Sequence, residues 1–358
     1  MLLRCALALL ALAGAARGTQ VGEVATFAGS SSGYADGDAT SAKFFLPFGP
    51  CVDPSGDPLY LTDLLNQVVR KISGGTVSTL AGAQGTMGYA DGAGGAAQFK
   101  YPSGCAIDAS GNVFVVDSNN HALRKVTPGG TVSTFVGVPP PTAASGLQDG
   151  TGSAALLSSP TAVAMDGAGN MYVTDSGNNA IRKVTAAGVV TTLAGNGTAG
   201  LTNGVGALAT FTNPRYIAVD AEGTVLYISD YDNHAIRKLV IATGAVTTYA
   251  GSGTAGFTDG LGTSAQFYQP QGVALDAGGV VYVADRCVAR RAAACLSRSP
   301  WCATAQPQQR HPRHHARRHR QHARRQRHVR LHRRRGRCGG IPWAHGPCHR
   351  AAWHAVRG

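Results

Sequence analysis

Histidines and closely spaced acids are the side chains of this sequence that could ligate a metal or move a proton. Before Arg286, histidine occurs at His121 and His234, each after an asparagine at the same place in a repeating pattern. Histidine can act as an acid, a base or a metal ligand, but two turn histidines in separate repeats are better explained as structural residues. Asp36 and Asp38 could bind calcium through their carboxylates, although Asp36-Gly37 is itself a turn of the repeat. We therefore predict no catalytic residue and no cofactor, with calcium as the open alternative.

Two cysteines and one sequon carry the remaining candidate chemistry. Cys51 and Cys105 belong to no CxxC pair, and they could form one bridge in an oxidising compartment. The sequence does not decide whether they do. Asn196-Gly197-Thr198 is a glycosylation sequon in a predicted loop, so Asn196 is a candidate acceptor if the chain is exported.

The N-terminus has the features of an export signal. Arg4 precedes an apolar stretch from Cys5 to Ala13, and the small residues Ala16 and Gly18 suit cleavage before Thr19. The stretch is shorter than a membrane-spanning helix requires. We predict a signal peptide over residues 1–18 and a secreted or secretory-lumen protein without a transmembrane segment.

Charge divides the chain into two unlike parts. Residues 1–285 carry 13 basic and 19 acidic side chains, whereas residues 286–358 carry 19 arginines and no acidic residue. The formal net charge of +13 therefore averages two different compositions and does not make the first part a nucleic-acid binder. With 48 glycines and 7% aromatic residues the chain is a poor helix former, so we expect an all-β fold.

The chain repeats itself with a period close to that of a propeller blade. Pro47, Pro102, Pro160, Pro214 and Pro270 recur at spacings of 55, 58, 54 and 56 residues. One copy, Val189 to Val240, holds four short alternating or β-branched segments separated by glycine, asparagine or aspartate turns. Four short strands per repeat are typical of a β-propeller blade.

The best-preserved segments identify the repeat type. NNAIRKV, DNHAIRKL and NHALRKV, joined to a PxGVAxD-x2-GxVYVxD pattern, resemble the NHL repeat over about residues 23–285. The resemblance implies a β-propeller, commonly with six blades. Relatives of this type include secreted and membrane-tethered scaffolds, RNA-binding domains and a peptide-amidating lyase.

About five blades are visible, four of them complete with four strands each and the fifth only half present, so the ring is incomplete as written. Residues 24–29 (VATFAG) match an outer strand without a preceding blade, which is how an N-terminal strand closes a propeller by completing the last blade. We therefore predict a propeller over residues 19–285 with six blades in the authentic protein.

The region 286–358 departs abruptly from the repeat and is rich in arginine and histidine. After Asp285 the repeat requires a segment similar to SGNNAIRKV, and the degenerate codons from Pro307 onward permit that segment in a shifted frame. We interpret this tail as unstructured and as a retained intron followed by a frameshift. A genuine tail would instead bind nucleic acid or an anionic polysaccharide.

The acidic, exported propeller is best explained as a non-catalytic binding scaffold for a protein or glycan ligand. The alternative is a propeller enzyme, a metal-dependent lyase or a lactonase, with its site at the central channel. Departures from the repeat mark the candidate ligand surface. They are the run Pro139, Pro140 and Pro141, and Tyr231, which replaces a serine.

Overall fold

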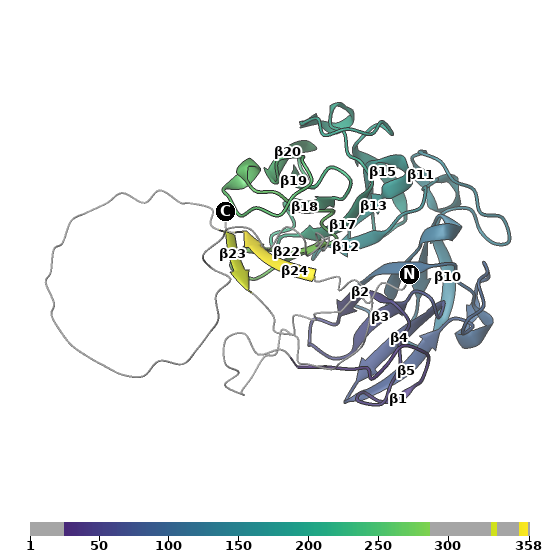
Figure 1. The fold of residues 1–358 in the computed structure, drawn as a ribbon. Helices are drawn as coiled ribbons and strands as arrows, with labels where there is room; N and C mark the ends of the chain where they lie inside the picture. Colours follow the sequence, from purple (N-terminus) through teal and green to yellow (C-terminus); the bar gives the residue numbers. More distant parts are fainter. Residues whose placement is uncertain (1–24, 287–330, 335–350, 357–358) are drawn as a thin grey trace, which may run out of the picture.

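The computed structural model describes residues 25–286, together with the strands at 331–334 and 351–356. Five antiparallel sheets succeed one another along the chain and are arranged around a common centre (Figure 1). Each sheet is one blade, and we number the blades in chain order. The predicted all-β propeller is confirmed. In the described residues, no helix has the length and apolar character needed to cross a membrane.

Each blade runs from an innermost strand, which begins at the repeated proline or two residues after it, to an outer strand. Blade 1 holds β1 (Gly37–Asp38), β2 (Pro47–Val52), β3 (Leu59–Asp63), β4 (Val68–Ser73) and β5 (Thr76–Ala81). Blade 2 holds β6 (Gly92–Ala93), β7 (Pro102–Ile107), β8 (Val113–Asp117), β9 (Ala122–Val126) and β10 (Thr131–Val136). Blade 3 holds β11 (Gly150–Thr151), β12 (Ala162–Met165), β13 (Met171–Asp175), β14 (Ala180–Val184) and β15 (Val189–Ala194). Blade 4 holds β16 (Gly204–Val205), β17 (Pro214–Val219), β18 (Val225–Asp230), β19 (Ala235–Val240) and β20 (Ala245–Ala250).

Blades 1 to 4 have five strands each, one more than the sequence predicts. The additional strand has two residues and pairs with the outermost long strand of the same blade, as β6 does with β10. It begins at the glycine of the Asp-Gly or Asn-Gly pair, for example Gly92. A two-residue strand has no measurable alternation, so pattern reading could not detect it.

The fifth blade combines repeat and tail residues. It contains β21 (Gly272–Leu275), β22 (Val281–Arg286), β23 (Leu331–Arg334) and β24 (Ala351–Val356), in the order β21-β22-β24-β23. Two short tail segments are therefore strands, whereas residues 287–330 and 335–350 lie outside the described part. The predicted signal peptide over residues 1–18 also lies outside it. The frameshift interpretation of the tail is not tested and stays a prediction.

The hydrophobic core lies between blades rather than within them. One face of each sheet packs on the next sheet, as when Val116 and Leu123 of blade 2 meet Val173 and Val184 of blade 3. Equivalent clusters lie between blades 1 and 2, 3 and 4, and 4 and 5. A further cluster centred on Leu61 and containing Phe44, Leu59 and Ile72 comes from blade 1 alone. Neighbouring blades thus stabilise one another by burying apolar surface.

The expected outer strand at residues 24–29 is not formed in its described part. Residues 25–29 have no strand, and Val24 lies outside the described residues. Gly29 nevertheless has the backbone of Gly82, which follows the outer strand of blade 1, with φ of 105° and 107° respectively. A strand requires a neighbour for its backbone hydrogen bonds, and in the described residues no third strand of a preceding blade is present. The alignment of this segment with the repeat is therefore sound, but residues 25–29 do not form the predicted strand, and the pairing with a last blade stays a prediction.

Candidate functional site

A buried ion pair joins the second and third long strands of blades 1 to 4. In blade 3, Arg182 Nη1 donates to Asp175 Oδ2 at 2.7 Å, and both side chains are fully buried. Asp175 also accepts from the Ser158 backbone N–H and from Asn178 Nδ2. The same pair recurs in the other three blades, with the arginine seven positions after the aspartate: Asp63 and Arg70, Asp117 and Arg124, Asp230 and Arg237. We call these four pairs the Asp–Arg ladder.

A second side-chain acceptor pairs with Nη2 of each ladder arginine. Arg182 Nη2 donates to Asp149 at 2.8 Å, and Arg70 and Arg124 use Asp36 and Asp91 in the same way. In blade 4 the acceptor is the side-chain oxygen of Asn203 at 3.0 Å. In blades 1 to 3 the aspartate of the Asp-Gly turn is thus an ion-pair partner as well as a turn residue. Asp36, the candidate calcium ligand, serves Arg70 in this way.

Burial governs the acidity of the ladder. It raises the pKa of Asp117 to about 6, against the opposing effect of Arg124 and of hydrogen bonds from Asn120 and the Lys100 N–H. It raises the pKa of Asp230 to about 6 for the same reason. Every carboxylate in these pairs accepts hydrogen bonds from its own repeat, so its evident role is structural. Within residues 25–286 no three His, Cys, Asp or Glu side chains gather as a metal site would require.

The two histidines link neighbouring blades. His121 and His234 both have left-handed backbones, with φ of 55° and 52°. Their Nδ1 atoms accept the backbone N–H groups of Ser159 and Gln269, each at 3.0 Å and each in the next blade. Because an accepting Nδ1 carries no proton, this contact requires the neutral tautomer of the ring, with its proton on Nε2. Burial lowers the pKa of both histidines.

The same link exists where the repeat lacks histidine. Gln67 accepts from the Tyr101 N–H at 2.7 Å, and Asn179 accepts from the Asn213 N–H at 2.8 Å. We call these four contacts the interblade latches. The prediction that the histidines are structural is consistent with this geometry.

The innermost strands β2, β7, β12, β17 and β21 lie side by side in chain order, and hydroxyl groups link the residues at their starts. We call the residues that follow the repeated prolines the rim residues: Phe48, Ser103, Thr161, Arg215 and Gln271. The carbonyl of each of the last four accepts a hydroxyl from the preceding blade. Ser103 Oγ, for example, donates to the Thr161 carbonyl at 2.7 Å. The rim backbone is therefore rigid, whereas its side chains differ between blades.

In blades 2 and 3 the rim side chain pairs with a serine. Ser103 Oγ lies 2.8 Å from Ser118 Oγ, and Thr161 Oγ1 lies 2.6 Å from Ser176 Oγ. Each serine follows the ladder aspartate directly. These hydroxyls form hydrogen bonds with one another and with backbone carbonyls, so the rim residues of blades 2 and 3 already have hydrogen-bond partners within the protein.

In blade 4 both members of that pair differ. Arg215 takes the place of the rim hydroxyl and Tyr231 that of the serine, and the guanidinium carbon lies 4.1 Å from the centre of the tyrosine ring. This distance is typical of a cation–π contact. Tyr231 is 4% exposed, and its hydroxyl donates to Gln269 Oε1 at 3.1 Å and accepts from Arg286 Nη1 at 2.8 Å. Tyr231, a predicted ligand residue, is thus a buried platform beneath Arg215.

An aromatic contact completes this side of the rim. Phe48 of blade 1 lies 5.1 Å from Tyr216 of blade 4, measured between ring centres. The strands β2, β7, β12 and β17 contact one another in that order. A contact between the first and the fourth means that the inner strands curve around a narrow centre. The candidate functional site therefore consists of Arg215, Gln271, Phe48 and Tyr216.

The sequence patterns did not single out Arg215. The available signal was the aligned position after the repeated proline, where Ser103 and Thr161 in blades 2 and 3 contrast with arginine in blade 4. Tyr231 stands out because it replaces a serine. Its partner Arg215 lies sixteen residues earlier on another strand, at a repeat position that holds a different residue in each of the five blades. Only the three-dimensional contact joins the two changes.

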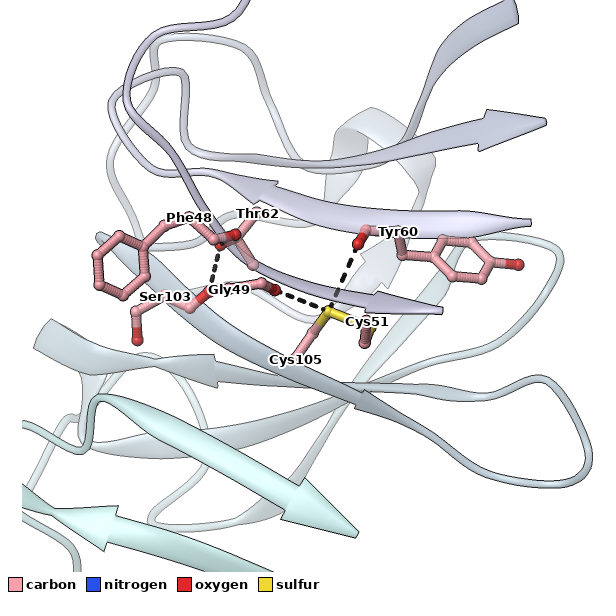
Figure 2. Close-up of a disulfide and its surroundings, with 7 residues drawn as sticks. All are labelled: Phe48, Gly49, Cys51, Tyr60, Thr62, Ser103 and Cys105. Carbon is pink, nitrogen blue, oxygen red and sulfur yellow. Dashed lines mark hydrogen bonds between the residues drawn. A yellow bond between two sulfur atoms is a disulfide. The ribbon is translucent and has the colours of Figure 1, made fainter. Parts of the chain in front are cut away.

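A disulfide bridges blades 1 and 2 below the rim. Cys51 and Cys105 are bonded on the adjacent inner strands β2 and β7. Figure 2 shows the bridge toward one end of these strands, with Phe48 and Ser103 toward the other. Thr62 lies between the rim positions and donates to the carbonyls of Phe48 and Ser103. The open question of pairing is thus resolved in favour of a bridge.

The remaining predicted sites lie elsewhere. Pro139 and Pro141 are exposed and Pro140 is half-buried in the loop between β10 and β11, remote in sequence from Tyr231. Asn196 is exposed in the loop after β15. Its Nδ2 donates to the Ala207 carbonyl at 2.8 Å, and its Oδ1 accepts the Thr198 N–H at 2.9 Å. Nδ2 keeps a second hydrogen, so this conformation is compatible with glycosylation.

Comparison with known proteins agrees with the repeat. A family model described as NHL repeat matches residues 99–126 and 267–290. Protein SUPPRESSOR OF QUENCHING 1, chloroplastic, from Arabidopsis thaliana is 29% identical over 273 residues, which are 71% of this chain and 25% of that protein. NHL repeat-containing protein 2 from Bos taurus is 34% identical over 165 residues, which are 43% of this chain and 22% of that protein. The chain spans a quarter or less of the length of these relatives.

Solved structures with a similar trace include proteins of different kinds. An auxiliary nutrient binding protein from Bacteroides thetaiotaomicron has a TM-score of 0.47 at 17% identity, covering 73% of each chain. A streptogramin B lyase has a TM-score of 0.43 at 12% identity, covering 66% of this chain and 61% of its own.

Proposed function

We propose that this chain, which belongs to the NHL repeat family of β-propellers, acts as a non-catalytic binding scaffold for a protein or glycan ligand. The observation that carries the proposal is the stacking of Arg215 on Tyr231 at 4.1 Å. Two positions that hold hydroxyls in blades 2 and 3 have changed together in blade 4. A paired change on a rigid rim is expected of a binding surface on a repeat scaffold.

The acidic residues and histidines make contacts that support a propeller enzyme less well than they support a binding scaffold. A lyase or lactonase would need such side chains free to converge on the central channel. The ladder carboxylates instead accept from arginine, as Asp117 does from Arg124 at 2.6 Å. His121 and His234 accept backbone N–H groups of neighbouring blades. Each of these groups already holds the fold together, which favours binding over catalysis.

We propose an oxidising, extracellular or secretory-lumen location. The signal-like residues 1–18 and the Cys51–Cys105 bridge support it. Sequencing the N-terminus of protein recovered from culture medium tests the location. A start at Thr19 is expected, and protein retained inside the cell with Met1 intact would contradict it.

We also propose that the authentic propeller has six blades. Leu46, the residue before the first repeated proline, has φ of 56°, like Tyr101 with φ of 56°, whose N–H donates to the latch of the preceding blade. Blade 1 thus has the backbone geometry of a blade with a predecessor. The apolar cluster around Leu61, built from blade 1 alone, would lie against the same predecessor.

Ligand capture tests the scaffold proposal. The double variant Arg215→Thr, Tyr231→Ser gives blade 4 the rim pair of blade 3, and Lys183→Thr removes one charge from β14 away from the rim. The wild type and Lys183→Thr should recover the same partner from extracellular fluid, whereas the double variant should not. The same recovery with all three proteins would exclude the rim, and no recovery with the wild type would contradict the scaffold function.

A further inference from the structure

Arg215 differs from the ladder arginines in having no hydrogen-bond acceptor. Each ladder arginine donates from both terminal nitrogens, as Arg124 does to Asp117 and Asp91. Within residues 25–286 the terminal nitrogens of Arg215 make no ion pair and no hydrogen bond, whereas its buried Nε lacks a partner just as the Nε of each ladder arginine does. These terminal N–H groups can therefore donate to a ligand, and a hydrogen bond from a guanidinium to a carboxylate is stronger than one between neutral groups.

Tyr231 holds this guanidinium in place. The ring lies against Arg215 and is itself fixed by the hydrogen bond from its hydroxyl to Gln269 Oε1 at 3.1 Å. Gln269 is in turn held by the His234 latch at 3.0 Å. The cation is therefore presented on a rigid base, with its terminal N–H groups available. A planar guanidinium presented in this way matches a carboxylate through two parallel hydrogen bonds.

The neighbours of Arg215 define what else the ligand must contain. Gln271 has the same rim position in blade 5, and its side-chain amide makes no hydrogen bond within the described part of the chain. An amide of this kind pairs with a peptide bond, giving one donor and one acceptor. Phe48 and Tyr216 add an aromatic surface. Together they fit one carboxylate, one amide and one apolar side chain.

A polyhydroxylated ligand fits this rim less well. It would need many free polar partners, yet Ser103, Ser118, Thr161 and Ser176 already bond to one another and to carbonyls. We propose that Arg215 on Tyr231 is a carboxylate-binding site for an extended protein segment with an apolar residue beside the acid. The carboxylate comes from an acidic side chain or from a chain terminus. This inference rests on the proposed scaffold function and specifies its ligand.

Peptide arrays distinguish the two sources. The full chain is applied to immobilised nonapeptides that carry Glu-Phe or Gln-Phe internally, and to peptides ending in Phe with a free or an amidated C-terminus. We expect binding to one acidic form and loss of about tenfold or more in affinity for its neutral counterpart. Arg215→Thr should lose the same binding, Arg215→Lys should retain part of it, and Lys183→Thr should bind as the wild type does.

Three results would overturn the proposal. They are equal binding of acidic and neutral peptides, binding that survives Arg215→Thr, and Arg215-dependent binding of an oligogalacturonate in place of every peptide. If the wild type and Arg215→Thr captured the same partner equally well, the scaffold function would stand. The proposed carboxylate site at Arg215 would then be wrong. Circular dichroism of each variant confirms that the propeller is folded, so loss of binding is not loss of structure.

Discussion

Arg182 Nη1 and Asp175 Oδ2 lie 2.7 Å apart, and both side chains are fully buried. Each buried charge is therefore stabilised by the opposite charge of its partner. Arg182→Leu leaves the Asp175 carboxylate buried without its cation, although Asn178 and the Ser158 N–H still donate to it. We expect this variant to lose about 3 to 5 kcal/mol of unfolding free energy. Urea denaturation measures it.

Lys183→Leu on the same strand is the matched control, because Lys183 is half-buried and belongs to no ladder pair. It should change the stability by less than about 1 kcal/mol. If the two variants were equally stable, the ladder would not be the structural element that we describe.

The disulfide joins blade 1 to blade 2 across a sequence separation of 54 residues. At the corresponding place blade 2 meets blade 3 through Ala106 and Val163. The variant Cys51→Ala, Cys105→Val therefore keeps the interblade packing and removes only the bond. We expect a loss of about 4 kcal/mol, seen as a lower urea midpoint. An unchanged midpoint, or two free thiols in the native wild type, would contradict the bridge.

The His121 and His234 latches should make stability depend on pH. Because burial lowers their pKa values, the unfolded chain binds protons that the folded chain does not, and stability falls as pH falls through about 6.5. His121→Asn and His234→Asn copy the Asn179 latch of blade 3 without a titrating group. The double variant should lose less stability than the wild type between pH 7.5 and 5.5.

Urea midpoints at a series of pH values give this comparison. The ladder carboxylates are present in both proteins, so their contribution cancels. Parallel pH profiles would show that the histidine rings do not carry the latch.

Much of the fold could be predicted from the repeat because each blade follows one pattern. The proline spacing and the turn glycines placed the four long strands of blades 1 to 4. The two-residue strands were missed because their signal is only a glycine after Asp or Asn, as at Gly92. The strand expected around Phe27 did not form because strand formation depends on a partner as well as on local pattern.

The site was harder to predict than the fold. The pairing of Asp117 with Arg124 could have been read from its seven-residue spacing in four repeats, but strand alternation alone placed the arginine on a face without saying what lay opposite. Tyr231 differs from the serines that blades 2 and 3 have at the same position, Ser118 and Ser176. Arg215 gives no such signal, because the rim residue differs in every blade and the role of the arginine appears only when the tyrosine ring lies against it.

The transcript offers a test of the tail. We predict that mature message lacks the segment between the codons of Asp285 and Pro307, and that the restored frame continues the repeat toward a sixth blade. Sequencing cDNA across these codons provides the measurement. Recovery of tail peptides from the secreted protein would show instead that the tail is genuine, and polyanion binding with steep salt dependence would then be expected.

Site-specific photo-cross-linking tests the central claim, that the rim is the binding surface, most directly. A benzophenone amino acid replaces Gln271 at the rim or, as a control, Val189 on the outer strand β15, which is 39% exposed. Irradiation in extracellular fluid should give one discrete adduct from position 271 and none from position 189. Equal labelling from both positions, or an adduct from position 189 alone, would contradict the account.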